Sequence, residues 1–158
     1  MTKPGEESFF DSRAAILASI PHRAPFLFVD QIVEITEQGI KCAYRFKEDE
    51  YFFQGHYPSN PIVPGVILCE AAMQAGAVFT SRVLIGDSEE KTKLPVVGRM
   101  NDVKFKRLVR PGELIEEEVT LKEKMAGAYV FKAKTFCEGK LALSFEFIVT
   151  LVDPPEEV

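Results

Sequence analysis

Two histidines are the only imidazole groups in this 158-residue chain, and one of them lies where it could act on a substrate. His56 follows Gly55 and precedes Tyr57-Pro58, and this combination of a permissive glycine and a fixed proline predicts a rigid, irregular loop. Imidazole exchanges protons near neutral pH, which suits a general base. Residue type alone leaves two interpretations open for His56, a catalytic base or a packing histidine. The other histidine, His22, is interpreted as structural.

Glu70 is the second residue that could do chemistry, because it is the only charged residue between Gly65 and Thr80. An ionised carboxylate in apolar surroundings is disfavoured by several kcal/mol unless it is paired or its pKa is raised. A raised pKa is what a general acid needs. Gln74 lies four residues later, on the same helical face, where its amide can orient the carboxylate. The alternative is a glutamate at the helix edge that reaches water.

The start of the helix that carries Glu70 supplies a third chemical element. The first backbone N–H groups of a helix lack internal partners and carry partial positive charge, so they stabilise a developing oxyanion. Pro64, Gly65 and Val66 are therefore the candidate oxyanion and substrate-binding segment. A base on a loop, an acid in a helix and free N–H groups together favour removal of a proton beside a carbonyl and expulsion of a hydroxyl. That reaction is an elimination, or in reverse a hydration.

A cluster of basic residues interrupts an otherwise acidic chain. The chain has 19 Lys and Arg against 24 Asp and Glu, a formal charge of −5, which is the wrong sign for binding a nucleic acid backbone. The basic residues lie within twelve positions whose only acid is Asp102. Their interaction with an acidic protein or a phosphate-bearing ligand is one interpretation, and a solvated strand face is the other. They are Arg99, Lys104, Lys106, Arg107 and Arg110.

Hydrophobic spacing predicts the elements that must position these residues. A helix is expected from Ser8 to Ile20, and a long helix, apolar almost all round and therefore enclosed, from Gly65 to Ile85. Strand-like runs cover 26–35, 40–46, 95–105, 113–124, 128–136 and 141–152. The pattern predicts an α+β fold in which a curved antiparallel sheet wraps around one long central helix. We expect one domain over 8–153, with flexible ends at 1–7 and 154–158.

The cysteine pattern and the apolar run indicate where the chain resides. Three cysteines form no CxxC pair, and no secretory signal pattern begins the sequence, which predicts a reducing cytoplasm. Each cysteine is interpreted as a small buried hydrophobe. The apolar run over 62–86 is interrupted by Pro64, Glu70, Gln74 and Arg82, so a membrane span is not expected.

The sequence of several segments resembles that of one family, the β-hydroxyacyl-acyl carrier protein dehydratases of dissociated fatty-acid synthesis, which are hotdog-fold enzymes. The resemblance covers roughly residues 20 to 150. It is carried by Pro21-His22-Arg23-Ala24-Pro25-Phe26-Leu27-Phe28-Val29-Asp30, Phe52-Phe53-Gln54-Gly55-His56-Tyr57-Pro58, Pro61-Ile62-Val63-Pro64-Gly65-Val66, Glu70-Ala71 with Gln74-Ala75, Phe105-Lys106-Arg107 and Pro111-Gly112.

The resemblance implies a role for each candidate residue. His56 would be the base and Glu70 the acid, contributed by different subunits of a homodimer, while Gly65 polarises the thioester carbonyl and Gln74 holds Glu70. The substrate would be a β-hydroxyacyl chain on the phosphopantetheine arm of acyl carrier protein, so neither a metal nor a bound cofactor is implied. The basic strand would meet the carrier at Lys104, Lys106, Arg107 and Arg110. Whether dimers assemble into trimers of dimers is left open.

Two other functions compete with dehydration. A hotdog acyl thioesterase can also use a helix carboxylate and a helix N-terminus, but it hydrolyses the thioester. A non-catalytic subunit could bind an acyl chain or a carrier without turnover. Glutamate at position 70, where the related dehydratase/isomerases carry aspartate, favours simple dehydration.

Overall fold

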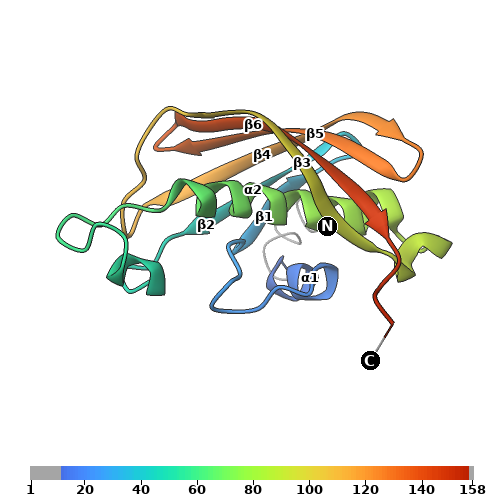
Figure 1. Ribbon diagram of the computed structural model, residues 1–158, viewed down its shortest axis with the longest axis horizontal. Helices are drawn as coiled ribbons and strands as arrows, with labels where there is room; N and C mark the ends of the chain where they lie inside the picture. Colours follow the sequence, from blue (N-terminus) through green and yellow to red (C-terminus); the bar gives the residue numbers. More distant parts are fainter. Residues whose placement is uncertain (1–11, 157–158) are drawn as a thin grey trace, which may run out of the picture.

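The computed structural model describes residues 12–156, which form a six-stranded antiparallel sheet curved around one long helix (Figure 1). The strand order is β1-β2-β4-β5-β6-β3. The helices and strands are α1 (Ser12–Ser19), β1 (Gln31–Ile35), β2 (Gly39–Arg45), α2 (Gly65–Phe79), β3 (Leu94–Phe105), β4 (Leu114–Met125), β5 (Ala128–Cys137) and β6 (Lys140–Val152). The predicted α+β architecture is confirmed.

Small residues on α2 let the helix pack closely against the sheet. A Cβ atom added at Gly76 would lie 2.7 Å from the Phe147 ring of β6, so no larger residue fits there without a shift. The expected enclosure of the helix is incomplete, however. A stripe at helical spacing is half-buried or exposed, and it consists of Val66, Glu70, Met73 and Ala77. The candidate acid therefore lies on the one face of α2 that the chain's own sheet leaves uncovered.

The end of the long helix lies where the sequence predicts it. After Phe79 the helix continues as a π-helical segment, Thr80–Ile85, and Gly86 then adopts a φ of 52°, which favours glycine. By length and composition Gly65–Ile85 could cross a membrane, but most of it is buried against the rest of the fold. It is packed as a core helix.

The first predicted strand is shorter than expected. The prediction began at Phe26, whereas β1 begins at Gln31. The backbone of the preceding residues bonds to a side chain instead of a strand: Gln74 Oε1 accepts from Phe28 N at 2.7 Å, and Gln74 Nε2 donates to Phe26 O at 3.1 Å. The predicted helix start at Ser8 and the predicted flexible end 1–7 lie outside the described residues, as do the last two residues of the other predicted flexible end, 154–158.

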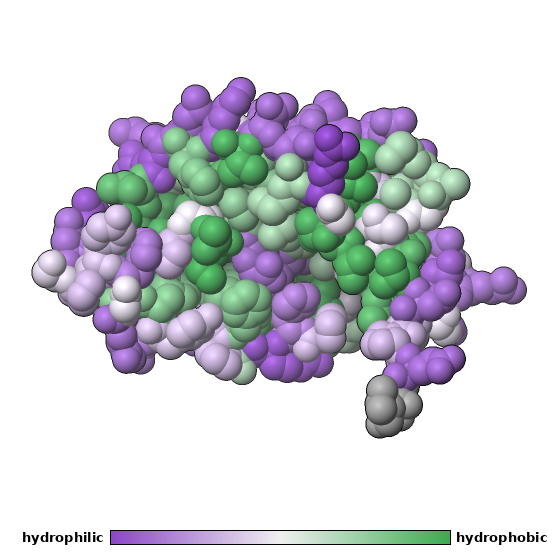
Figure 2. Space-filling view, viewed as in Figure 1, coloured by the Kyte–Doolittle hydropathy of each residue, from purple (hydrophilic) through white to green (hydrophobic). Residues whose placement is uncertain are grey.

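Strand β3 is an edge of the sheet and carries exposed apolar side chains. It pairs with β6 on one side only, which leaves a twelve-residue edge unpaired in the described chain. In Figure 2, apolar side chains gather over the part of the molecule that β3 crosses in Figure 1. Those that are more than a third exposed are Leu94, Val96, Val97, Met100, Val103 and Phe105. Long apolar edges pair with other chains unless they are protected.

Candidate active site

The loop that carries His56 is held rigidly. The loop begins with a 3-10 turn, Tyr51–Gln54, and its Phe52 ring packs edge-on against Phe46. The buried Glu50 carboxylate, just before the turn, accepts a hydrogen bond of 2.5 Å from the Tyr44 hydroxyl. Burial, together with this bond, raises the pKa of Tyr44, so the phenol stays a donor at neutral pH.

One hydrogen bond fixes the orientation and the tautomer of His56. Its Nδ1 atom lies 3.0 Å from Ile62 O, and because a carbonyl only accepts, Nδ1 must carry the hydrogen. In the neutral ring, Nε2 is then an unprotonated nitrogen able to take a proton. The Tyr57 ring lies edge-on to the imidazole, with 4.9 Å between the ring centroids. The backbone of Tyr57 has a φ of 51°, a strained value for a residue other than glycine. Such strain occurs where a loop is held in one shape.

The start of α2 lies in the same pocket as His56. Gly65 is the first helical residue, and neither its N–H nor that of Val66 donates to another described residue. A Cβ atom at Gly65 would be 2.8 Å from the Phe105 ring, so this close approach requires glycine. We call this the His56 pocket, and it is lined by His56, Ile62, Val63, Gly65, Val66, Leu68, Phe105, Arg107, Leu108 and Val109.

Glu70 lies in a different pocket. Its Oε1 atom accepts a hydrogen bond of 3.0 Å from Gln74 Nε2, as the sequence predicts, and lies 3.5 Å from His22 Nε2. Gln74 is almost fully buried and is itself fixed by the backbone of the segment that precedes β1. We call this the Glu70 pocket, and it is lined by His22, Glu70, Met73, Gln74, Ala77, Pro95, Val96, Val97 and Val149.

The structure therefore brings His56 together with the helix start but not with Glu70. Glu70 comes five positions after Gly65, and at about 100° per residue its side chain is rotated roughly 140° around the helix axis from the helix start. The base, the oxyanion donors and the acid do not form one site within a single chain. Pro64 precedes the helix as its N-cap residue, and its carbonyl accepts from Ile67 N at 2.9 Å.

An apolar groove continues from the Glu70 pocket. The two share four lining residues, and the groove extends past the end of α2 toward Ile85 and Gly86. Its lining is mostly apolar, with Lys91 and Lys93 as its charged members. The shared residues are His22, Ala77, Pro95 and Val96. An extended apolar chain that reaches Glu70 has continuous space beyond it.

The four candidate docking residues are exposed or half-exposed at and beyond the Phe105 end of β3. Arg107 lines the His56 pocket and forms an ion pair of 3.0 Å with Glu138. Arg110 donates to Asn60 Oδ1 at 3.1 Å. Lys104 and Lys106 have no side-chain partner among the described residues and remain available to an external acidic group.

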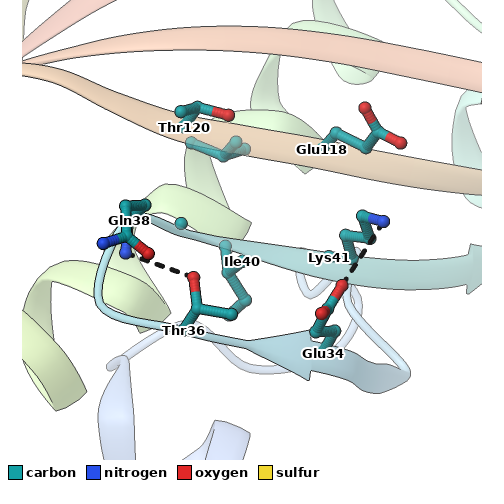
Figure 3. A pocket seen from close by; sticks show the side chains of 9 residues that line it. Glu34, Thr36, Gln38, Ile40, Lys41, Glu118 and Thr120 are labelled. Carbon is teal, nitrogen blue, oxygen red and sulfur yellow. Dashed lines mark hydrogen bonds and ion pairs between the residues drawn. The ribbon is translucent and has the colours of Figure 1, made fainter.

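Other polar features of the described chain offer no comparable chemistry. A small pocket at the β1–β2 hairpin contains the Lys41–Glu34 ion pair at 3.3 Å, and the Thr36 hydroxyl there accepts a hydrogen bond from the Gln38 backbone N–H (Figure 3). Within residues 12–156 no group of three or more His, Cys, Asp or Glu side chains is placed to hold a metal. All three cysteines are free and buried, and burial raises the pKa of Cys69 and Cys137 to about 11, so they remain thiols.

Comparisons with known proteins identify the family. A family model described as a FabA-like domain matches residues 20–146. The chain belongs to the FabA-like family. Two curated relatives of this FabA-like chain are named 3-hydroxyacyl-acyl-carrier-protein dehydratase FabZ. The protein from Caldicellulosiruptor saccharolyticus is 42% identical, covering 84% of this chain and 96% of its own length. The relative from Caulobacter vibrioides is 39% identical, and the match covers 89% of this chain and 87% of the relative's own length.

Solved structures resemble the fold of this FabA-like chain. The dehydratase heterocomplex ApeI:P from Xenorhabdus doucetiae matches with a TM-score of 0.72 at 15% identity, over 89% of this chain and 91% of that one. The thioesterase HI1161 from Haemophilus influenzae matches with a TM-score of 0.58 at 16% identity, over 78% of each chain. At such identities the likeness concerns the fold, and the hotdog fold that the sequence resemblance implied is confirmed.

One residue that lines the Glu70 pocket was not among the candidates singled out from the sequence. His22 was interpreted as structural, yet its ring lines both the Glu70 pocket and the apolar groove. Two signals were available in the sequence. The chain has only one histidine besides His56, and that histidine lies in the segment Pro21-His22-Arg23, which resembles the family. The contact between His22 and Glu70 could not be predicted from local spacing, because the two residues are 48 positions apart in the sequence.

Proposed function

We propose that this chain dehydrates β-hydroxyacyl-acyl carrier protein to the trans-2-enoyl thioester in fatty-acid or related lipid synthesis. The reaction class is that of a hydro-lyase, in accord with the curated relatives' names. The observation that carries the proposal is His56, whose Nδ1–H is bound to Ile62 O so that Nε2 is free. This nitrogen shares a pocket with the N–H groups at the start of α2, which donate to no other described residue.

The His56 pocket performs the first half of the reaction. The thioester carbonyl oxygen accepts from the N–H of Gly65, and the partial positive charge at the start of α2 stabilises the enolate as it forms. His56 Nε2 takes the α-proton, because its other nitrogen is already bound to a carbonyl. Pro64 comes just before the helix, and Val66 is its second residue and lines the His56 pocket. Both hold the thioester against the helix start.

The second half of the reaction uses Glu70 of a partner subunit. The C–O bond at the β-carbon breaks, and the hydroxyl leaves as water with the proton of the Glu70 carboxylic acid. The double bond forms between the α- and β-carbons. Solvent then removes the proton from His56 and restores the one that Glu70 gave.

The edge strand β3 explains how two chains complete one site. Phe105, at one end of β3, lines the His56 pocket, while Pro95, Val96 and Val97, at the other end, line the Glu70 pocket. If two copies of β3 pair antiparallel about a two-fold axis, each end lies beside the opposite end of the partner. The His56 pocket of one chain then adjoins the Glu70 pocket of its partner. This pairing also covers the exposed apolar edge.

The remaining parts of the site suit the substrate. The apolar groove beyond Glu70 receives the acyl chain, and its continuity with the Glu70 pocket favours a chain that extends well beyond the β-carbon. Lys104, Lys106, Arg107 and Arg110 receive the acidic carrier protein, which brings its own phosphopantetheine arm. We place the enzyme in the cytoplasm, and the chemistry assigned here requires no metal or bound cofactor.

The test is a product assay that separates the competing functions. Purified protein is mixed with a β-hydroxyacyl thioester on carrier protein, and enoyl-thioester absorbance and free thiol are followed together. Dehydration gives enoyl absorbance without thiol. A thioesterase gives thiol without enoyl absorbance, and a non-catalytic subunit binds the substrate and leaves it unchanged. Either of these last two results contradicts the proposal.

A further inference from the structure

His22 is held in place by the end of the first helix. It lies in the loop after α1, and the Arg23 guanidinium donates to three backbone carbonyls around it. These are Leu17 O at 3.0 Å, Ile20 O at 2.8 Å and His22 O itself at 2.7 Å. The backbone of His22 is thus anchored independently of Glu70.

The two carboxylate oxygens of Glu70 have different surroundings. Oε1 lies 3.0 Å from Gln74 Nε2 and 3.5 Å from His22 Nε2. Oε2 has no partner among the described residues. Both nitrogen groups therefore converge on one oxygen and leave the other free.

The surroundings of the other ring nitrogen indicate the tautomer of His22. Its Nδ1 atom is buried and has no hydrogen-bond partner among residues 12–156. A buried donor without an acceptor is unfavourable, and protonation of Nδ1 would create one. With Nδ1 unprotonated, the neutral ring carries its hydrogen on Nε2, which is the atom that faces Glu70.

We propose that His22 is a positioning residue for the acid. Neutral His22 presents Nε2–H to Glu70 Oε1 beside the Gln74 amide, so the acidic proton is held on Oε2 and points away from both donors. This inference rests on the proposed function, in which Glu70 protonates the departing hydroxyl. When Oε2 gives its proton to that hydroxyl, the negative charge left on the carboxylate is stabilised at Oε1 by the two N–H donors. Hydrogen bonds of this kind are often long in a substrate-free site and shorten in the reacting complex.

The kinetic test compares two substitutions at one position. His22→Phe keeps a planar ring but removes the donor, and we expect kcat to fall about tenfold, the effect of one hydrogen bond to a charged group, with KM nearly unchanged. His22→Gln keeps an N–H donor and should retain most of kcat. Wild-type kcat in His22→Phe, or an equal loss in both variants with unchanged melting temperatures, overturns the inference.

A second measurement does not depend on turnover or on a substitution of His22 itself. The chain has two histidines, so ¹⁵N-histidine labelling of the wild-type protein gives two sets of ring signals, which His56→Ala assigns. We expect His22 as the neutral Nε2–H tautomer, in contrast to Nδ1–H for His56. An Nδ1–H or doubly protonated His22 overturns the inference. Failure of the wild type to dehydrate any substrate would instead contradict the proposed function, which separates the two results.

Discussion

The most unusual group outside the site is Glu117, a carboxyl in the core of the sheet. Glu117 is 1% exposed on β4, opposite Cys42 of β2 and Thr135 of β5. Its Oε2 accepts a hydrogen bond of 2.5 Å from the Thr135 hydroxyl, while Oε1 has no partner in the part of the chain that the structure describes. Burial raises the pKa of Glu117 from 4.5 to about 8, although the bond from Thr135 partly opposes the shift.

This shift makes the stability of the fold depend on pH. Because the raised pKa belongs to the folded state, folded Glu117 keeps its proton above pH 4.5 while the unfolded chain releases it. The contribution of Glu117 to stability is complete below pH 4.5 and is lost as the pH rises toward about 8. Each pH unit in this interval lowers the free energy of unfolding by about 1.4 kcal/mol. Between pH 5 and pH 8 the loss is on the order of 3 to 4 kcal/mol.

Glu117→Gln isolates this effect, because the amide has nearly the same shape and does not titrate. Urea unfolding of both proteins is measured at pH 5, 6, 7 and 8, at one protein concentration and with a reductant. We expect the variant to gain stability over the wild type as the pH rises, by the 3 to 4 kcal/mol estimated above. The two proteins share all other titrating groups, so the contributions of these groups cancel in the difference between the two free energies of unfolding. A difference that stays constant over this range would refute the reasoning.

Three further predictions concern assembly, packing and docking. Val97→Lys puts a charge on the β3 edge, so light scattering should show a monomer and activity should be lost; an active dimer contradicts the edge pairing. Gly76→Ala pushes a Cβ against Phe147 and should lower the free energy of unfolding by about 1 to 2 kcal/mol in urea, since overpacking exceeds the gain in helix propensity; an increase contradicts this packing. Lys106→Glu should raise KM several-fold for carrier-bound substrate but not for a small free thioester, and equal effects on both would remove the docking role.

The parts of the fold that were predictable rest on local patterns. The long helix was found because its apolar run ends at Gly86, and Gly139, with a φ of 72°, lies between the predicted strand runs 128–136 and 141–152 and allows the chain to turn there. Both depend on residues next to each other in the chain. The start of β1 was wrong because Gln74, far away in sequence, binds the backbone that the pattern assigned to a strand.

The sequence singles out the residues of the candidate site but not their arrangement in space. Residue type and position make His56, Gly65, Glu70 and Gln74 candidates, and helical spacing predicted the bond between Glu70 and Gln74 that the structure contains. The rotation of Glu70 away from the helix start separates the two pockets, and only the edge position of β3 shows how they can meet. Glu117 lies in an acidic run that suggests solvent, although Ile115 and Val119 on either side at alternate positions indicate an inward face.

The central claim is that His56 of one chain works with Glu70 of its partner, and heterodimers test it directly. His56→Ala and Glu70→Gln chains are co-expressed with different tags and purified as mixed dimers, which contain one complete site of the two. We predict about half of wild-type dehydration from these dimers, while each parent variant alone is inactive. A mixed dimer of wild type with the doubly substituted chain has no complete site and should be inactive. The reverse pattern, an inactive first dimer and a half-active second, would show that each site lies within one chain and would contradict the account.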